Sequence, residues 1–285
     1  MRVAVLGSAG QLGRDLLPRL KGEGIPLTRA DIDLATPANA LGFLESVRPD
    51  VLVNCAAYNL VDKAEDDPAP AFAVNEGGVV TLAVACAALE VKLVHVSTDY
   101  VFGSDTARTT PYLETDTPGP VSQYGRSKLA GEAFVRQYRQ HLAVRTCGLY
   151  GVWGSGGKGG NFVETMLRVA GQGKPLRVVA DQRCTPTYTA DLAEGIAELI
   201  EKGTTGLIHL TNSGDCTWHE FAAKIFELSG ITTDVTPITS AEFGAKAQRP
   251  GYSVLGSNRT EETGVKLRPW QEALASYLEE RKRKV

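Results

Sequence analysis

The first 150 residues alternate between short apolar runs and longer segments in which apolar residues recur at helical spacing. Each apolar run has the length of a buried strand. The runs cover 1–7, 25–28, 50–57, 92–97 and 142–151. The segments between them predict helices. The clearest of these cover 11–21, 37–47 and 71–90. Because strands that alternate with helices are typical of βαβ units, the pattern predicts an α/β fold with a doubly wound, Rossmann-like parallel sheet.

The pattern loosens after Gly151. Further helices are predicted near 161–172, 190–202 and 217–229 and from about 269, and further strands near 176–179 and 206–211. We therefore expect two parts. Residues 1–150 form a dinucleotide-binding Rossmann domain, and residues 151–285 form mainly a smaller α/β substrate-binding lobe, with some segments returning to the first domain.

Composition narrows the classes of function. The chain has 285 residues, a formal net charge of -3 and 43% hydrophobic residues, so nothing favours a nucleic-acid partner. We find no run of 18 apolar residues and no signal-peptide pattern, and we expect a cytoplasmic protein without a membrane span. The five cysteines and four histidines show no ligand spacing, which argues against a disulfide framework and a zinc site.

Glycines punctuate the turn between the first strand and the first helix. Gly7, Gly10 and Gly13 form a G-x-x-G-x-x-G pattern, which lets a backbone turn tightly and approach a pyrophosphate closely. This context predicts a dinucleotide site. A second glycine-rich stretch at 154–160 does not match a phosphate-binding loop, and we interpret it as a flexible connector or a lid.

The residues after the second strand bear on the choice of dinucleotide. An acid there bonds the ribose 2′-hydroxyl of NADH, whereas an arginine suits the 2′-phosphate of NADPH. The strand ends with Thr28 and Arg29, which favours NADPH, and Asp31 and Asp33 keep NADH possible.

Tyr124 and Lys128 lie four residues apart at the start of a predicted helix and are therefore neighbours on one face. An ammonium group near a phenol is expected to lower the phenol's pKa. Such a tyrosine can give a proton to a carbonyl oxygen as hydride reaches the carbon, and the lysine can hold a cofactor ribose. Ser97 and Thr98 end the fourth strand, where ligand sites of parallel sheets form, and a hydroxyl there can fix the substrate oxygen.

This order of glycine turn, hydroxyl and Tyr-x-x-x-Lys resembles the extended short-chain dehydrogenase/reductases. Longer matches resemble their dTDP-4-dehydrorhamnose reductase branch over nearly the whole chain. The matching segments lie at 53–65, 73–78, 94–104, 124–132, 181–193, 217–221 and 249–255. The most telling of them are STDYVF within 94–104 and DQ-x-x-x-PT at the start of 181–193.

The resemblance implies reduction of the 4-keto group of dTDP-4-dehydro-L-rhamnose to dTDP-L-rhamnose by NADPH or NADH. It implies that Tyr124 donates the proton, that Lys128 holds the ribose, and that Thr98 and Asp99 meet the sugar. The implied cofactor contacts are Gly10, Gln11 and Leu12 at the pyrophosphate, Asp33 and Leu34 near the adenosine, and Ala57, Tyr58 and Asn59 beside the nicotinamide. The family often forms homodimers, sometimes with a divalent ion such as Mg²⁺ nearby.

Some of these positions have plainer interpretations. Asp99 could cap a turn, Tyr58 could serve packing alone, and Asn54 could bond only backbone. Arg249 could be a surface charge, although arginine suits a diphosphate, and we treat it as a candidate substrate contact.

One position departs from the family pattern. Gly148 stands where the family usually has a tryptophan that contacts the substrate, and Trp153 is a candidate to fill the gap. The sugar could therefore differ, so a related nucleotide-deoxysugar 4-ketoreductase or epimerase remains an alternative. A second alternative is a non-catalytic regulatory subunit of the same fold.

Overall fold

The computed structural model describes residues 1–153, 160–173 and 175–284. The stretch 154–160, for which the sequence predicts a connector or a lid, lies outside the described residues except for Gly160. The helices of the first half are α1 Gln11–Leu16, α2 Ala40–Val47, α3 Val61–Asp66, α4 Ala69–Phe72, α5 Val79–Ala88 and α6 Gln123–Val135. Those of the second half are α7 Phe162–Ala170, α8 Thr189–Glu201, α9 Trp218–Ser229, α10 Ser240–Phe243, α11 Thr260–Thr263 and α12 Trp270–Lys284. Short 3-10 turns occupy Leu17–Arg19 and Asp99–Val101.

A six-stranded parallel sheet forms the centre of the molecule, as the alternating pattern predicts. Its strands are β1 Arg2–Leu6, β2 Glu23–Leu27, β3 Val51–Asn54, β4 Lys92–Thr98, β5 His141–Thr146 and β10 Gly206–His209. They lie in the order β10-β5-β4-β3-β1-β2, and every neighbouring pair is parallel. The chain therefore runs outward in both directions from β1 and β3, and the crevice between those strands is where doubly wound sheets bind ligands.

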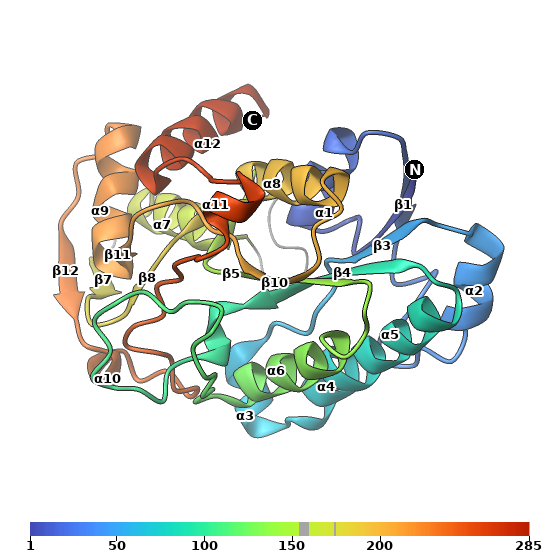
Figure 1. The fold of residues 1–285 in the computed structure, drawn as a ribbon. Helices are drawn as coiled ribbons and strands as arrows, with labels where there is room; N and C mark the ends of the chain where they lie inside the picture. Colours follow the sequence, from blue (N-terminus) through green and yellow to red (C-terminus); the bar gives the residue numbers. More distant parts are fainter. Residues whose placement is uncertain (154–159, 174, 285) are drawn as a thin grey trace.

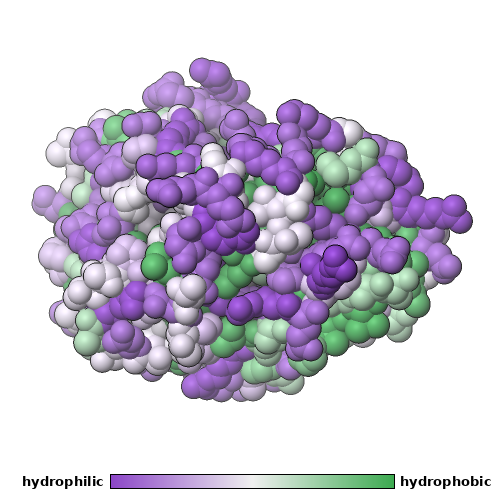
Figure 2. Space-filling model, viewed as in Figure 1, coloured by the Kyte–Doolittle hydropathy of each residue, from purple (hydrophilic) through white to green (hydrophobic). Residues whose placement is uncertain are grey.

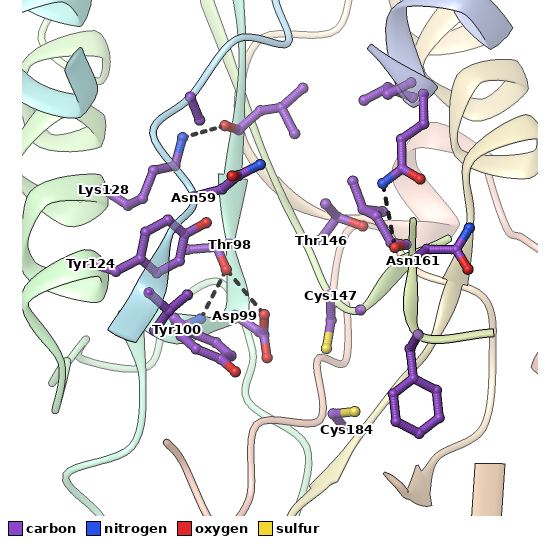
Figure 3. A pocket seen from close by; sticks show the side chains of 18 of the residues that line it. Asn59, Thr98, Asp99, Tyr100, Tyr124, Lys128, Thr146, Cys147, Asn161 and Cys184 are labelled. Atoms are coloured by element: carbon purple, nitrogen blue, oxygen red, sulfur yellow. Dashed lines mark hydrogen bonds between the residues drawn. The ribbon is translucent and has the colours of Figure 1, made fainter. Parts of the chain in front are cut away.

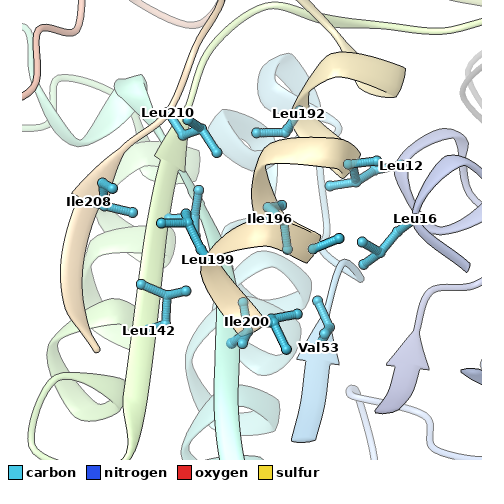
Figure 4. Packing of buried hydrophobic residues seen from close by; sticks show 14 of the residues in the cluster. Leu12, Leu16, Val53, Leu142, Leu192, Ile196, Leu199, Ile200, Ile208 and Leu210 are labelled. Carbon is cyan, nitrogen blue, oxygen red and sulfur yellow. The ribbon is translucent and has the colours of Figure 1, made fainter. Parts of the chain in front are cut away.

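Helices cover both faces of this sheet (Figure 1). On one face α1 and α8 pack on the strands, and on the other face lie α2, α5 and α6. Figure 4 shows Leu192, Ile196 and Leu199 of α8 directed at Leu142 of β5 and at Leu12 of α1. Each helix has one apolar face, and the strands are apolar on both faces. The helices therefore pack on both sides of the sheet and form three layers.

Two segments from the second half join this central sheet. Strand β10 pairs with β5, and α8 packs against α1. Most of the remaining elements of that half gather around a second core, in which the rings of Tyr188, Phe221 and Tyr277 pack around that of Tyr150. Their strands form three two-stranded pairs. These are β6 Leu149–Tyr150 with β9 Thr187–Tyr188, β7 Leu176–Val179 with β12 Val235–Ile238, and β8 Arg183–Cys184 with β11 Cys216–Thr217.

The long helix predicted over 71–90 is interrupted. A π-helical stretch, Ala73–Gly78, separates α4 from α5. The end of this stretch packs closely on a neighbouring loop, because a Cβ at Gly78 would lie 2.4 Å from the carbonyl oxygen of Leu34. The wider turn also directs Asn75 away from the helix, where its amide bonds both the N–H and the C=O of Tyr58.

Among the described residues, the stretch Ala69–Ala88 is long and apolar enough to cross a membrane by length and composition alone. Val79, Leu82 and Cys86 from this stretch are buried against the sheet, and the core helix of a globular protein can have the same length and apolar composition. Outward-facing Val84, together with Leu41 of α2, is exposed. Figure 2 shows apolar surface gathered at the lower right, where α2, α4 and α5 lie in Figure 1.

A buried ion pair fixes α6 to the sheet. Glu132 of α6 and Arg145 of β5 are both fully buried, and Arg145 donates to the carboxylate from Nε at 2.9 Å and from Nη2 at 2.6 Å. Ser97 of β4 donates to the same carboxylate at 2.7 Å. Two strands and the helix therefore meet at one fully bonded charge, which defines the height and rotation of α6 above the sheet.

Removing one partner of this pair should destabilise the protein strongly. We expect Arg145→Met to lower the free energy of unfolding by about 3–5 kcal/mol, because Glu132 would remain as a buried, uncompensated charge. Urea denaturation followed by circular dichroism measures this change. The control is Arg136→Met, which removes a half-exposed arginine 3.8 Å from the same carboxylate and should change stability by less than about 1 kcal/mol. Equal effects of the two variants would contradict this account.

Candidate active site

A cleft of about 930 Å³ opens at the carboxyl ends of β1, β3, β4 and β5. Its other wall comes from α7, β8 and the start of α9, together with the loop around Arg249. The predicted site residues that line it are Gly7, Gly10, Gln11, Leu12, Gly13, Ala57, Asn59, Thr98, Asp99, Tyr124, Lys128, Gly148 and Arg249. Residues predicted from distant parts of the sequence thus meet around one cavity.

The glycine turn follows β1 and forms one end of this cleft. Gly7 has φ +84°, and a Cβ there would lie 2.9 Å from the backbone nitrogen of Ala56. A Cβ at Gly13 would lie 2.4 Å from the carbonyl oxygen of Gly7. Both positions therefore require glycine, the first for its backbone angle and the second for the close approach of α1 to the turn.

Two buried polar atoms in this part of the cleft have no hydrogen-bond partner within the described protein. They are Oε1 of Gln11 and Oγ1 of Thr146. Unpaired buried oxygens are costly, and a ligand with donor groups would satisfy them. A nicotinamide dinucleotide fits this end of the cleft, because its pyrophosphate suits the glycine turn and its carboxamide and ribose groups offer such donors.

Four predicted cofactor residues do not line the cleft. Arg29, Asp33 and Leu34 follow β2, whose last carbonyl bonds the N–H groups of Gly7 and Ser8. Arg29 is largely exposed and pairs with Asp33, and Leu34 is buried in the core. Tyr58 is the fourth, and both of its backbone groups bond Asn75. Their cofactor roles stay predictions.

Tyr124 enters the cleft from the first turn of α6, which Ser122 caps by accepting the N–H of Gly125 at 3.1 Å. Burial raises the pKa of Tyr124 to about 12, and the nearby Asp99 acts in the same direction, while hydrogen bonding to Thr98 opposes them. The expectation that Lys128 makes this phenol more acidic is wrong for this structure. Burial dominates the shift and Lys128 does not contribute to it, so the phenol keeps its proton at neutral pH.

Lys128 lies one turn further along α6 and is almost completely buried. Its Nζ donates to the carbonyl oxygen of Val96 at 2.8 Å and lies 3.4 Å from Nε2 of His95. Burial lowers the pKa of Lys128 to about 8, although Glu132 and Cys55 act against this shift. Figure 3 shows Tyr124 and Lys128 projecting from α6 into the cavity, with Tyr124 next to Thr98 and Thr146 on the opposite side.

Asp99 and Arg249 line the cleft but also have partners within the chain. Ser253 donates to Asp99 at 2.6 Å, and Thr98 donates to it at 3.1 Å. Burial raises the pKa of Asp99, and these hydrogen bonds limit the increase. Arg249 forms a bidentate ion pair with Asp62 of α3, in which Nη2 donates to Oδ2 at 2.8 Å and Nη1 donates to Oδ1 at 3.2 Å. Both contacts join the first half of the chain to the loop at 247–253.

The gap at Gly148 is filled differently from the prediction. Trp153 is not part of the cleft wall, because its indole N–H donates to Asp15 of α1 at 2.9 Å. Trp218, the first residue of α9, lies there instead, with Cη2 3.5 Å from the position that a Cβ at Gly148 would occupy. Its ring packs on Phe162 with centroids 4.8 Å apart, and both side chains line the cleft.

Several residues of the cleft are not among the predicted site residues. Trp218 lies within the matching segment 217–221, but its place in the cleft, like that of Phe162 and Thr146, depends on tertiary packing. Cys147 and Cys184 also line it, and burial raises the pKa of the Cys147 thiol far above its usual range. Within the described ranges, no group of three or more histidine, cysteine or acidic side chains is arranged to hold a metal ion.

A parallel sheet of this order, with a glycine turn after β1 and Tyr124 and Lys128 beside Thr98, defines an extended short-chain dehydrogenase/reductase. The chain belongs to the family described as RmlD substrate binding domain, whose model matches residues 1–283.

Individual relatives agree with this membership. The chain is 40% identical over 284 residues to the spore coat polysaccharide biosynthesis protein SpsK of Bacillus subtilis, covering 98% of both chains. It is 40% identical over 280 residues to the dTDP-4-dehydrorhamnose reductase of Mycolicibacterium smegmatis, covering 96% of this chain and 84% of the relative. The crystal structure of a dTDP-4-dehydrorhamnose reductase from Bacillus anthracis in complex with NADP superposes with a TM-score of 0.91 at 38% identity, covering 98% of this chain and 99% of that one.

The glycine turn can be tested without a substrate. We expect Gly13→Ala to weaken binding of a nicotinamide dinucleotide at least about tenfold, or about 1.4 kcal/mol, because the new Cβ collides with the backbone of Gly7. Titration of the reduced dinucleotide by its fluorescence measures the affinity. The control is Gly42→Ala in α2, where a Cβ meets nothing within 4 Å and affinity should not change. Unchanged binding by the Gly13 variant would show that the dinucleotide lies elsewhere.

Proposed function

We propose that this protein reduces the 4-keto group of dTDP-4-dehydro-L-rhamnose to the alcohol of dTDP-L-rhamnose with NADPH. The observation that carries the proposal is the meeting of Thr98, Tyr124 and Lys128 in a cleft that begins at a dinucleotide-type glycine turn. Family membership and the names of the relatives support the choice of substrate.

The chemistry assigned to the chain is proton donation. When bound, NADPH supplies the hydride that is added to the ketone carbon. Tyr124 gives its phenolic proton to the ketone oxygen, and its raised pKa keeps that proton in place until the oxygen becomes basic. The hydroxyl of Thr98 offers a second hydrogen bond to the same oxygen. Lys128, whose Nζ donates to the carbonyl oxygen of Val96, holds the ribose hydroxyls and so positions the cofactor beside Tyr124.

NADPH is the preferred cofactor in this proposal. The exposed guanidinium of Arg29 follows β2, beside the glycine turn, and can reach a 2′-phosphate. The Bacillus anthracis relative was solved with NADP, which supports the same choice. The ion pair between Arg29 and Asp33 is exposed, so little is lost when a phosphate displaces the carboxylate.

The nucleotide sugar lies toward the second wall of the cleft. Trp218 and Phe162 offer an apolar surface for the face and methyl group of a 6-deoxy sugar, in the place that Gly148 leaves free. Asp99 meets the sugar hydroxyls, and Arg249 meets the diphosphate. For the chain as a whole, we propose that residues 1–150 bind the cofactor and that residues 151–285 mainly bind the substrate.

The change at Gly148 favours one alternative, a related nucleotide-deoxysugar 4-ketoreductase or epimerase. A non-catalytic regulatory subunit has less support, because it would not require Thr98, Tyr124 and Lys128 together in one cleft. A homodimer and a cytoplasmic location stay predictions.

Replacing the proton donor tests the proposal. We expect Tyr124→Phe to lower kcat by about 10²- to 10⁴-fold, while the affinity for NADPH stays unchanged. The measurement is loss of NADPH absorbance with dTDP-4-dehydro-L-rhamnose as substrate. The control is Tyr138→Phe, which removes a phenol bonded to backbone far from the cleft and should leave kcat unchanged. Full turnover by the Tyr124 variant would rule out its role. If the wild-type protein binds NADPH but does not consume it, the other 4-keto nucleotide sugars become the next substrates to test.

The aromatic wall gives a second test. We expect Trp218→Ala to raise KM for the nucleotide sugar about tenfold, corresponding to about 1.4 kcal/mol, with a smaller change in kcat. Steady-state kinetics measures the split between the two constants. Trp153→Ala is the matched control, since that indole lies against α1 outside the cleft and its loss should leave KM unchanged. A stronger effect of the Trp153 variant would contradict the placement of the sugar.

A further inference from the structure

A chain of buried hydrogen bonds leads from β3 to the lysine of the site. Asn54 ends β3, His95 lies in the middle of β4, and both side chains are fully buried. The amide nitrogen of Asn54 lies 3.2 Å from Nδ1 of His95, and Nε2 of the same ring lies 3.4 Å from Nζ of Lys128. The proposed reaction uses Lys128 but assigns no role to the other two side chains.

The backbone determines the direction of these bonds. The N–H of Ala56 donates to Oδ1 of Asn54 at 3.0 Å, so the oxygen of the amide must face Ala56. The NH₂ group of Asn54 therefore faces His95 and donates a hydrogen bond, which Nδ1 of the ring must accept. A neutral ring that accepts at Nδ1 carries its own proton on Nε2, which is the nitrogen that faces Lys128.

We propose that Asn54 and His95 are positioning residues that hold a ring N–H against Lys128 and so restrict both the place and the charge of its Nζ. The N–H of Nε2 repels an ammonium group and can donate to the lone pair of a neutral amine. Nζ of Lys128 also donates a hydrogen bond to the carbonyl oxygen of Val96, and this bond orients the amine. The inference rests on the proposed function for its catalytic meaning, but the hydrogen-bond order itself does not.

The charged and titratable groups around Lys128 agree with such control. His95 faces it from β4, Cys55 from the residue after β3, and Tyr124 and Glu132 from α6. Burial lowers the pKa of Lys128 to about 8, and Glu132 and Cys55 oppose that shift. Burial and the charge of Lys128 hold the pKa of His95 well below its usual value, so the ring stays neutral. A ring N–H that faces Nζ acts in the same direction as burial, because it disfavours the ammonium form of Lys128.

The first test is the tautomer of His95 in the wild-type protein, read from long-range ¹H–¹⁵N spectra of the four histidines. His95→Asn identifies the signal by its loss. We expect a neutral ring between pH 6 and 9 with the proton on Nε2 and a free lone pair on Nδ1. A proton on Nδ1, or a ring that becomes charged in this range, would overturn the inference.

The second test reverses the tautomer. Asn54→Asp replaces the NH₂ donor with an acceptor, so the His95 proton should move to Nδ1 and the Nε2 lone pair should face Lys128. The pKa of Lys128 should then rise by about one unit, measured from its ¹³Cε shift after assignment with Lys128→Met. Asn75→Asp is the matched control, an equally buried amide that bonds Ser127 of α6 and does not touch His95, so the His95 tautomer should not change.

An Asn54→Asp protein whose His95 keeps its proton on Nε2 would refute the role of Asn54. If Asn54→Asp does not fold, the wild-type spectrum still decides the tautomer. All of these readouts are independent of turnover. If Tyr124→Phe remains fully active while the spectra are as expected, the proposed reaction is refuted and the proposed hydrogen-bond order is confirmed.

Discussion

The buried ion pair between Glu132 and Arg145 is the constraint on which the site depends. A fully buried carboxylate is tolerated only when every oxygen is bonded, and here one arginine and Ser97 of the neighbouring strand complete it. These partners come from the two strands beneath α6. The helix that carries Tyr124 and Lys128 is therefore held by a directional contact rather than by apolar packing alone, and the two side chains keep a fixed distance from Thr98 at the end of the same sheet.

Burial shifts the pKa values of Tyr124 and Lys128 in opposite directions, and in both cases it favours the neutral form. It raises the pKa of Tyr124 to about 12 and lowers the pKa of Lys128 to about 8, so the charged form of each becomes less stable. A donor that keeps its proton until the substrate oxygen gains charge suits a ketone reduction. In the proposed arrangement, the orientation of the His95 ring also bears on the charge of Lys128.

Much of this molecule could be predicted from the sequence, and the limits follow from the range of the interactions. The strands of the parallel sheet, the glycine turn and the Tyr124–Lys128 pair depend on local patterns, and all are present. The sequence does not reveal the π-helical stretch at 73–78, whose end packs closely on the backbone of Leu34. The direction expected for the pKa shift of Tyr124 is wrong, since neighbours along a helix say nothing about burial in the tertiary structure.

Gly148 and Trp218 show how a side chain can be supplied from another element. The loop after β5 turns at Gly148 with φ +55°, a conformation that a tryptophan would adopt only with strain. The indole instead comes from the first turn of α9, where the capping box of Thr217 and Glu220 fixes the helix start. Tyr124 and the glycine turn belong to elements before residue 150, whereas this wall belongs to elements after 160. Substitutions in α7 and α9 can therefore change this wall without disturbing Tyr124, Lys128 or the buried hydrogen bonds between Glu132, Arg145 and Ser97.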